Sequence, residues 1–89
     1  MKHKSLENLR SEIDALDQKI QLLIANRADL AAEVALVKKE SNKQSAFYRP
    51  EREAQVLLRL LRDNNGPLSN ESITNIFKSV ISNCRALEK

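Results

Sequence analysis

The chain has 89 residues, of which one is glycine, two are proline and three are aromatic, and this balance is typical of one small all-α domain with little capacity to bury a core alone. Its single cysteine excludes an intrachain disulfide and fits a reducing, cytoplasmic compartment, and its apolar runs are too short for a membrane span or a signal peptide. The net charge is +3, and the 15 basic residues are spread along the chain among 12 acidic ones. Since there is no basic run and no aromatic platform, neither nucleic-acid nor membrane binding is expected.

A long first helix is predicted over about residues 6–39, because one stripe of ten positions follows 3-4 spacing and nine of them are apolar. The stripe consists of Leu6, Leu9, Ile13, Leu16, Ile20, Leu23, Arg27, Leu30, Val34 and Val37. Ser5 is placed to cap the first turn. At 1.5 Å per residue this helix is roughly 50 Å long, and two short helices cannot cover it. A second chain is therefore expected to pack along it.

Two shorter helices are predicted to follow, over about residues 50–64 and 70–88. Pro50 suits the first position of a helix, and the sequence Asn64-Asn65-Gly66-Pro67 ends one. Ser69 is the expected N-cap of the last helix. The apolar residues of that helix recur at helical spacing and are Ile73, Ile76, Phe77, Val80, Ile81, Cys84 and Leu87. The prediction for residues 1–89 is a single all-α domain of one long and two short helices that pairs into a homodimer.

Arg27 interrupts the apolar stripe, and Lys38 lies eleven residues later on the same helix. Eleven residues make close to three turns, so the two cations share one face about 16 Å apart along the axis. Arg10 lies on another face, about 25 Å from Arg27, and cannot reach the same small molecule. In an antiparallel pair of long helices that cross near Ile20, the partner subunit's Arg10 falls between Arg27 and Lys38. The spacing therefore predicts an anion site with three cations, one of them from the other subunit.

Arg27 also has an ordinary structural interpretation, in which it sets the register of the helix pair or forms an ion pair. The candidate carboxylate partners are Glu12, Asp29 and Glu33. Arg10 and Lys38, taken singly, could be solvated surface residues. Periodicity alone does not decide between a register device and a ligand site.

The later helices carry four more candidates with two interpretations each. Arg52 and Glu53 either belong to a site or complement the dipole at the start of their helix. Cys84 is either a site residue or a small buried hydrophobe. Glu88 continues the stripe of Cys84 by four residues, and it either ends that face with a functional carboxyl group or is an exposed terminal residue.

Taken together, these segments resemble the all-helical chorismate mutases. The likeness covers residues 5–88 and rests on "LENLRSEIDALDQKIQLLIANRADLAAEVALVKK", "YRPEREAQVLLRL", "NNGPL" and "IFKSVISNCRALE". The patterns L-R-x-x-I-D-x-L-D, R-x-x-L-A-x-x-V-x-x-x-K and R-P-x-R-E are specific as a set. The chain is most similar to the N-terminal domain of the bifunctional bacterial chorismate mutase–prephenate dehydratases. The resemblance implies an intertwined, domain-swapped homodimer with two identical sites that are each built from both chains.

The resemblance also implies roles for the cations and for one carboxylate. By position, Arg27 and the partner subunit's Arg10 clamp the two carboxylates of chorismate, and Arg27 binds one of them bidentately. Lys38 reaches the other carboxylate and the ether oxygen of the substrate. Glu53 accepts a hydrogen bond from the ring hydroxyl, and Arg52 supports that end of the pocket.

Three further positions depart from the family pattern or vary within it. Cys84 stands where a relative has serine, which is a better hydrogen-bond donor. Arg49 stands where a relative has an acidic residue, so only its backbone is expected near the substrate. Glu88 stands where some relatives have glutamine and others glutamate. Its carboxyl must be protonated to donate to the ether oxygen, and an anionic substrate nearby is expected to raise its pKa and to favour activity at acidic pH.

The implied reaction is the isomerisation of chorismate to prephenate in phenylalanine and tyrosine biosynthesis. It is an intramolecular pericyclic rearrangement without group transfer or redox chemistry, so the site needs no nucleophile, metal or cofactor. The site must fold the enolpyruvyl chain over the ring and stabilise negative charge on the ether oxygen. The bifunctional relatives continue into a prephenate dehydratase domain, whereas this chain ends at "RALEK". It is either an excised domain of such a fusion or a free-standing mutase.

Two rival functions remain open. Isochorismate-pyruvate lyases share the fold and the cationic clamp but lack the glutamate after the arginine of the second helix, so Glu53 favours the mutase. A coiled-coil dimerisation module without enzymatic activity is the other rival. It predicts that the Arg27→Leu substitution stabilises the dimer at no functional cost.

Overall fold

The computed structural model describes residues 4–40 and 50–88, except the side chain of Glu88, and the described chain is helical without strands. The long helix α1 spans Leu6–Glu40, α2 spans Pro50–Arg62 and α3 spans Asn70–Arg85, and a short 3₁₀ turn, η1, follows at Ala86–Glu88. The predicted fold class, three helices with one long and two short, is confirmed.

Two helix ends differ from the predicted ones by more than one residue. Helix α2 ends at Arg62 instead of residue 64, because the backbone N–H of Asn64 donates to the carbonyl of Leu61 at 3.2 Å and tightens the last turn. Helix α3 ends at Arg85 instead of residue 88, and the chain continues in η1. Such 3₁₀ turns are common at the ends of α-helices.

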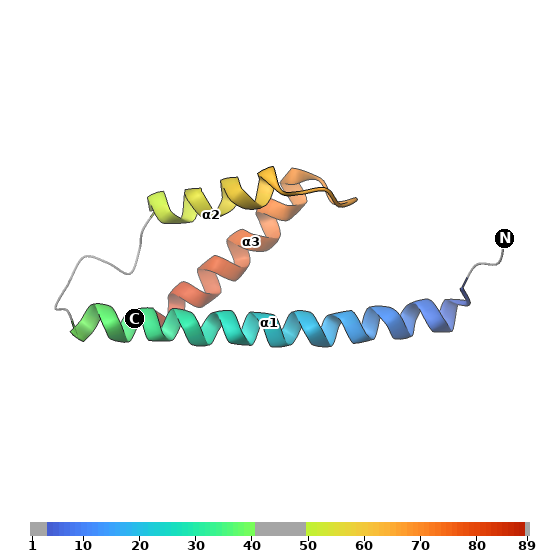
Figure 1. Cartoon of the computed structure of the whole chain (residues 1–89), viewed down its shortest axis with the longest axis horizontal. Coiled ribbons are helices and arrows are strands. Elements are labelled where there is room, and N and C mark those ends of the chain that lie inside the picture. Colours follow the sequence, from blue (N-terminus) through green and yellow to red (C-terminus); the bar gives the residue numbers. More distant parts are fainter. Residues whose placement is uncertain (1–3, 41–49, 89) are drawn as a thin grey trace.

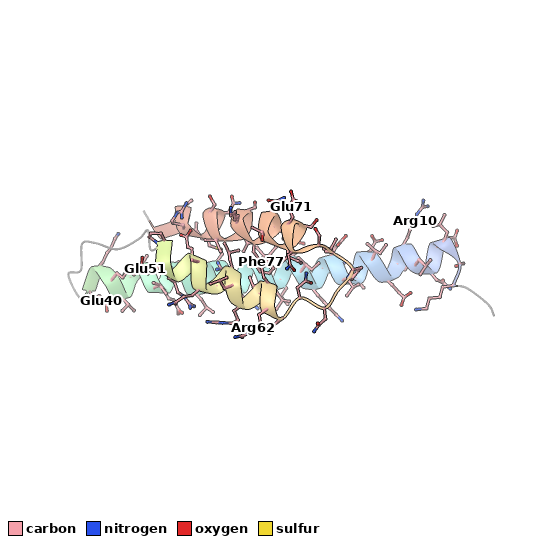
Figure 2. All side chains as sticks on the ribbon, turned by 90° about the horizontal axis from the view of Figure 1, so that it is seen from above. Arg10, Glu40, Glu51, Arg62, Glu71 and Phe77 are labelled. Carbon is pink, nitrogen blue, oxygen red and sulfur yellow. The ribbon has the colours of Figure 1, made fainter. Side chains whose placement is uncertain are left out.

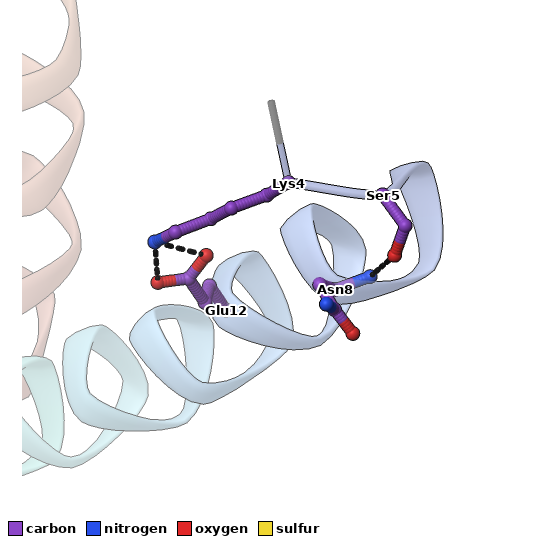
Figure 3. A network of polar contacts seen from close by, with 4 residues as sticks. All are labelled: Lys4, Ser5, Asn8 and Glu12. Atoms are coloured by element: carbon purple, nitrogen blue, oxygen red, sulfur yellow. Dashed lines mark hydrogen bonds and ion pairs between the residues drawn. The ribbon is translucent and has the colours of Figure 1, made fainter. Parts of the chain in front are cut away.

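Both predicted N-caps form. The Ser5 hydroxyl accepts a hydrogen bond from the backbone N–H of Asn8 at 3.1 Å, and the Ser69 hydroxyl accepts one from Ser72 at 3.1 Å. At the start of α1, Lys4 Nζ also donates to both carboxylate oxygens of Glu12, at 2.7 and 2.9 Å (Figure 3). This contact joins Lys4, which precedes α1, to Glu12 inside the helix.

Helix α3 holds the molecule together by crossing from α2 to α1 (Figure 1). Helix α1 packs against α3 and η1, and α2 packs against α3, while α1 and α2 have no direct packing contact within the described residues. The few buried apolar residues are Ala35 of α1 and Ile81 and Cys84 of α3. The core therefore lies where the C-terminal parts of α1 and α3 meet.

The N-terminal half of α1 extends beyond the other two helices (Figure 1). The molecule measures 61 × 24 × 15 Å and its radius of gyration is 17.1 Å, whereas a compact chain of this length would have a radius of about 12 Å. The apolar stripe on this half is largely exposed, at Leu9, Ile13, Leu16, Ile20 and Leu23. None of the described helices is both long enough and apolar enough to span a membrane.

Candidate active site

A pocket of about 520 Å³ lies between α1 and α2, with the C-terminal part of α3 as its floor. Ligand pockets commonly have volumes of about 300–1,000 Å³, so this one can hold a small organic molecule. Its lining residues are Arg27, Leu30, Ala31, Val34 and Lys38 from α1, Glu51, Arg52, Glu53, Gln55 and Val56 from α2, and Ile81, Cys84 and Arg85 from α3.

Five residues predicted from the sequence line this pocket together. Helix α1 contributes Arg27 and Lys38, α2 contributes Arg52 and Glu53, and α3 contributes Cys84. Arg27 and Lys38 share a wall because eleven residues make three turns of α1, as the spacing predicts. The pocket thus gathers charged side chains from α1 and α2, which are joined through α3.

The pocket lining combines an excess of cations over carboxylates with apolar side chains. Four cations and two carboxylates are among its lining residues, together with leucine, isoleucine, valine and alanine side chains. Both Arg27 and Lys38 are half-buried. A cation in a partly desolvated pocket attracts an anion more strongly than one in open water. A small dicarboxylate with an apolar body fits this combination of charges and walls.

Arg27 forms no ion pair within the described part of the chain, so the structural pairing that periodicity left open does not occur there. Its candidate partner Glu12 is bonded to Lys4 instead, at 2.7 Å. Asp29 and Glu33, the other two candidates, are exposed and take part in no ion pair among the described residues. The guanidinium group of Arg27 is therefore available to an anionic ligand in this chain.

Three predicted site residues are not among the described residues that line the pocket. Arg10 is exposed and lies far along α1, beyond the segment that α2 and α3 cover, so it does not line the pocket of its own chain (Figure 2). Arg49 lies outside the described residues. The backbone of Glu88 belongs to η1, next to the end of α3 that lines the pocket, and its side chain is outside the described part.

Cys84 is 5% exposed and lies with Ile81 on the floor of the pocket. A thiol is a weak hydrogen-bond donor and packs as a small apolar group. The structure thus agrees with the structural interpretation of Cys84 as a buried hydrophobe, while it also places the thiol against the pocket.

Arg85 is a pocket residue that the sequence reasoning missed. Its Nη1 donates to Oε2 of Glu53 at 2.5 Å, and this ion pair joins the end of α3 to the first turn of α2. A basic residue in the last turn of a helix is ordinarily explained by the helix dipole, so the sequence alone did not suggest a site role for Arg85. The available signal was its position four residues after Ile81, which places it on the face that α3 turns to the pocket.

Among the described residues, no group of three or more His, Cys, Asp or Glu side chains is arranged to hold a metal ion. The chemistry of the lining residues is that of anion binding through guanidinium and ammonium groups.

Comparison with known proteins gives one consistent family. The model of the family described as chorismate mutase type II matches residues 9–89. Bifunctional chorismate mutase/prephenate dehydratases from Stutzerimonas stutzeri and Pseudomonas aeruginosa are 47% and 45% identical over 87 residues. Each match covers 94% of this chain but only 24% of the relative. The chain therefore spans about a quarter of the length of these curated relatives.

Solved structures give the same result. A chorismate mutase from Thermus thermophilus superposes with a TM-score of 0.89 at 29% identity, and the match covers 96% of this chain and 94% of that one. A chorismate mutase from Helicobacter pylori in complex with prephenate superposes with a TM-score of 0.83 at 36% identity, covering 93% and 88%. The family resemblance inferred from the sequence is confirmed.

Proposed function

The chain belongs to the chorismate mutase type II family, and we propose that it isomerises chorismate to prephenate in the pocket between α1, α2 and α3. The observation that carries this proposal is the convergence of Arg27, Lys38 and Arg52 from two helices on one pocket of about 520 Å³. Chorismate is a small dianion with a six-carbon ring that carries a hydroxyl group, and prephenate, its isomer, is the molecule in the complex with the Helicobacter pylori relative. The charges and the size of the pocket support a ligand of this kind.

The reaction is a rearrangement within one molecule, so the residues act by position and charge. The C–O bond of the enolpyruvyl ether breaks while a C–C bond forms to the ring, and the side chain must first fold over the ring. Cations that hold both carboxylates fix this folded conformation and remove much of the entropic barrier. In the proposal, Arg27 holds one carboxylate with its planar fork, and the partner subunit's Arg10 holds the other.

Negative charge grows on the ether oxygen as the C–O bond breaks, and Lys38 is the proposed cation at that oxygen. A preorganised donor at such a position contributes on the order of 3–4 kcal/mol to the stability of the transition state. Glu88 is the proposed second donor, in its protonated form. This assignment rests on its position in the sequence and on the nearness of the η1 backbone to the pocket floor.

The end of the pocket formed by α2 is proposed to bind the ring. Glu53 would accept a hydrogen bond from the ring hydroxyl, and Arg52, one residue before it, would add positive charge beside it. Cys84 would only pack against the substrate, because its thiol is a poor donor. Glu53 is also the residue that favours a mutase over an isochorismate-pyruvate lyase.

We propose that the working unit is an intertwined homodimer with two shared sites. The exposed apolar stripe on the N-terminal half of α1 supports this, since a single chain leaves it uncovered. A second apolar hollow of about 300 Å³ lies at the junction of α1 and α3, on Ile24, Ala28, Val80 and Leu87 among other residues. An antiparallel partner helix would cover such surfaces and would carry its own Arg10 toward Arg27 and Lys38.

The relatives are bifunctional proteins of which this chain spans about a quarter. By analogy, we propose a role in aromatic amino acid biosynthesis, either as the mutase domain of a fusion with prephenate dehydratase or as a separate mutase. Both forms use the same pocket, so the proposed chemistry does not depend on which of them exists.

The direct test is to incubate the purified chain with chorismate and to follow the loss of its absorbance, with prephenate identified by NMR because it has the same mass as chorismate. Chorismate conversion to prephenate is expected, with no release of pyruvate. Release of pyruvate from isochorismate, without conversion of chorismate, would instead identify a lyase. A chain that leaves both compounds unchanged would contradict the proposal.

A further inference from the structure

We infer that Arg85 is a positioning residue of this site: it holds the carboxylate of Glu53 in the orientation that receives the ring hydroxyl of the substrate. The inference rests on the proposed function and adds to it a residue that acts through Glu53. The sequence places Arg85 on the same helix face as Ile81 but does not indicate its contact with Glu53. The contact appears only when α2 and α3 are brought together in the fold.

The geometry of the pair supports a positioning role. Arg85 Nη1 donates to Glu53 Oε2 at 2.5 Å, and the two residues are 32 positions apart in the sequence. Their side chains are 32% and 26% exposed, so the contact is more protected than the ion pair of Arg62 with Asp63, whose side chains are 74% and 66% exposed. Both Arg85 and Glu53 line the pocket. The pair is therefore part of the pocket wall and not a surface contact.

The pair leaves one oxygen of the carboxylate for a ligand. Oε2 of Glu53 accepts from Arg85, and the carboxylate has no other hydrogen bond among the described residues. A glutamate has three rotatable bonds, and an unrestrained carboxylate would sample several orientations in a pocket of this size. Restraint of one oxygen by Arg85 fixes the direction of Oε1, which is the remaining acceptor for the hydroxyl.

Arg85 also offsets an electrostatic conflict. The proposed substrate is a dianion, and Glu53 places a negative charge in the same pocket. Like charges at close range in a partly desolvated site repel each other. A guanidinium group bonded to Glu53 neutralises this charge and lets the carboxylate act as an acceptor without repelling the ligand.

The test is a double-mutant cycle on Arg85 and Glu53, with steady-state kinetics on chorismate. The Arg85→Leu substitution is expected to lower kcat/KM about tenfold, since a hydrogen bond to a charged group is removed. Most of the loss should be in KM, because the hydroxyl contact forms in the bound substrate as well as in the transition state. In a Glu53→Gln background the same substitution should cost less than about twofold, because the group that it positions is already altered.

Two further variants separate positioning from folding. Arg85→Lys keeps a cation near Glu53 and is expected to recover most of the loss in kcat/KM. Arg62→Leu removes an exposed arginine from an ion pair outside the pocket and should leave the kinetics unchanged. Circular dichroism and thermal unfolding of each variant report the folded fraction. A folding defect would lower kcat at constant KM and would be equal in both backgrounds.

The outcomes distinguish the inference from the proposed function. Wild-type kinetics in Arg85→Leu, or an equal loss with and without Glu53, would overturn the inference while chorismate conversion by the wild type still supports the mutase. No effect of Glu53→Gln would also overturn it. Failure of the wild-type chain to convert chorismate would contradict the proposed function itself.

Discussion

Arg27 occupies a position at which its helix otherwise presents apolar side chains. Charged groups at such positions either specify how helices pair or bind a ligand. The described structure gives Arg27 no ion pair, leaves it half-buried and places it in the wall of a pocket together with Lys38. The ligand interpretation is therefore the one that the geometry supports, and the two interpretations predict different results for one substitution.

The Arg27→Leu variant is predicted to lose at least about a hundredfold in kcat/KM for chorismate, because it removes a charge-assisted, bidentate carboxylate contact. It should also unfold at higher denaturant concentration, since a leucine in the apolar stripe removes the cost of desolvating a charge. Kinetics and chemical denaturation on the same samples measure both effects. A stabilised variant that still converts chorismate at the wild-type rate would indicate a register device.

The proposed role of Glu88 predicts that activity depends on pH. In the proposed mechanism the protonated carboxyl of Glu88 donates to the ether oxygen, so kcat should be highest at acidic pH and should fall as the pH rises and the proton is lost. Glu88→Gln carries a donor that does not titrate, and its profile should be flat. Measurement of kcat from about pH 5 to 8 compares the two proteins. A flat wild-type profile would rule out this role for Glu88.

At the scale of elements, the turn between α2 and α3 depends on Asn64. Its side-chain amide donates to the carbonyl of Leu68 at 3.0 Å and to Oδ1 of Asn70 at 2.8 Å, and its own Oδ1 accepts from the N–H of Gly66 at 3.3 Å. Asn64 is half-buried and thus bridges the end of α2 to the start of α3. The turn sets the angle at which α3 runs back to α1 and closes the floor of the pocket.

The Asn64→Ala substitution is predicted to lower the free energy of unfolding by about 1–3 kcal/mol, because it removes three hydrogen bonds, each with a net contribution of about 0.5–1.5 kcal/mol. Asn65→Ala is the matched control, since the adjacent residue is exposed and has no hydrogen bond among the described residues. Urea denaturation followed by circular dichroism compares the two. Equal stability of both variants would show that the turn does not depend on the Asn64 side chain.

The sequence was sufficient to predict the helices and to place part of the candidate site. The physical reason is different for the helices and for the site. Helix positions follow from local patterns, namely the 3-4 spacing of α1 and the cap at Ser69, and local patterns are visible in a sequence. Arg27 and Lys38 could be placed on one face because helical geometry fixes their relation. The contact of Arg85 with Glu53 could not be predicted, because it depends on how α3 crosses α2. No periodicity encodes that tertiary arrangement.

At the scale of the whole molecule, the single chain is elongated and leaves the apolar stripe of α1 largely uncovered. Leu16 and Ile20 are 55% and 52% exposed, and large exposed apolar surfaces of this kind mark association sites. The shape and the stripe together favour a dimer in which α1 of one chain covers α1 of the other. The proposed site requires the same arrangement, since Arg10 lies too far along α1 to reach the pocket of its own chain (Figure 2).

The Leu16→Glu substitution is predicted to convert the protein from about twice its chain mass of 10.1 kDa to a monomer, and to abolish chorismate conversion with it. A charge on the stripe would have to be desolvated in the dimer, so it favours separate chains. Gln18→Glu is the matched control, because it adds the same charge to α1 on the face opposite the stripe. Analytical ultracentrifugation measures the mass. A dimeric, active Leu16→Glu variant would contradict this mode of association.

A chorismate site shared between two chains is tested most directly by subunit complementation. Arg10→Leu and Arg27→Leu are each expected to be inactive alone, because every site in either homodimer lacks one cation. When the two variants are unfolded together and refolded in equal amounts, half of the dimers are mixed, and each mixed dimer has one intact site. Chorismate conversion should then return to about a quarter of the wild-type rate, as expected for a dimer with two equivalent sites. A mixture as inactive as its two components would contradict the shared site.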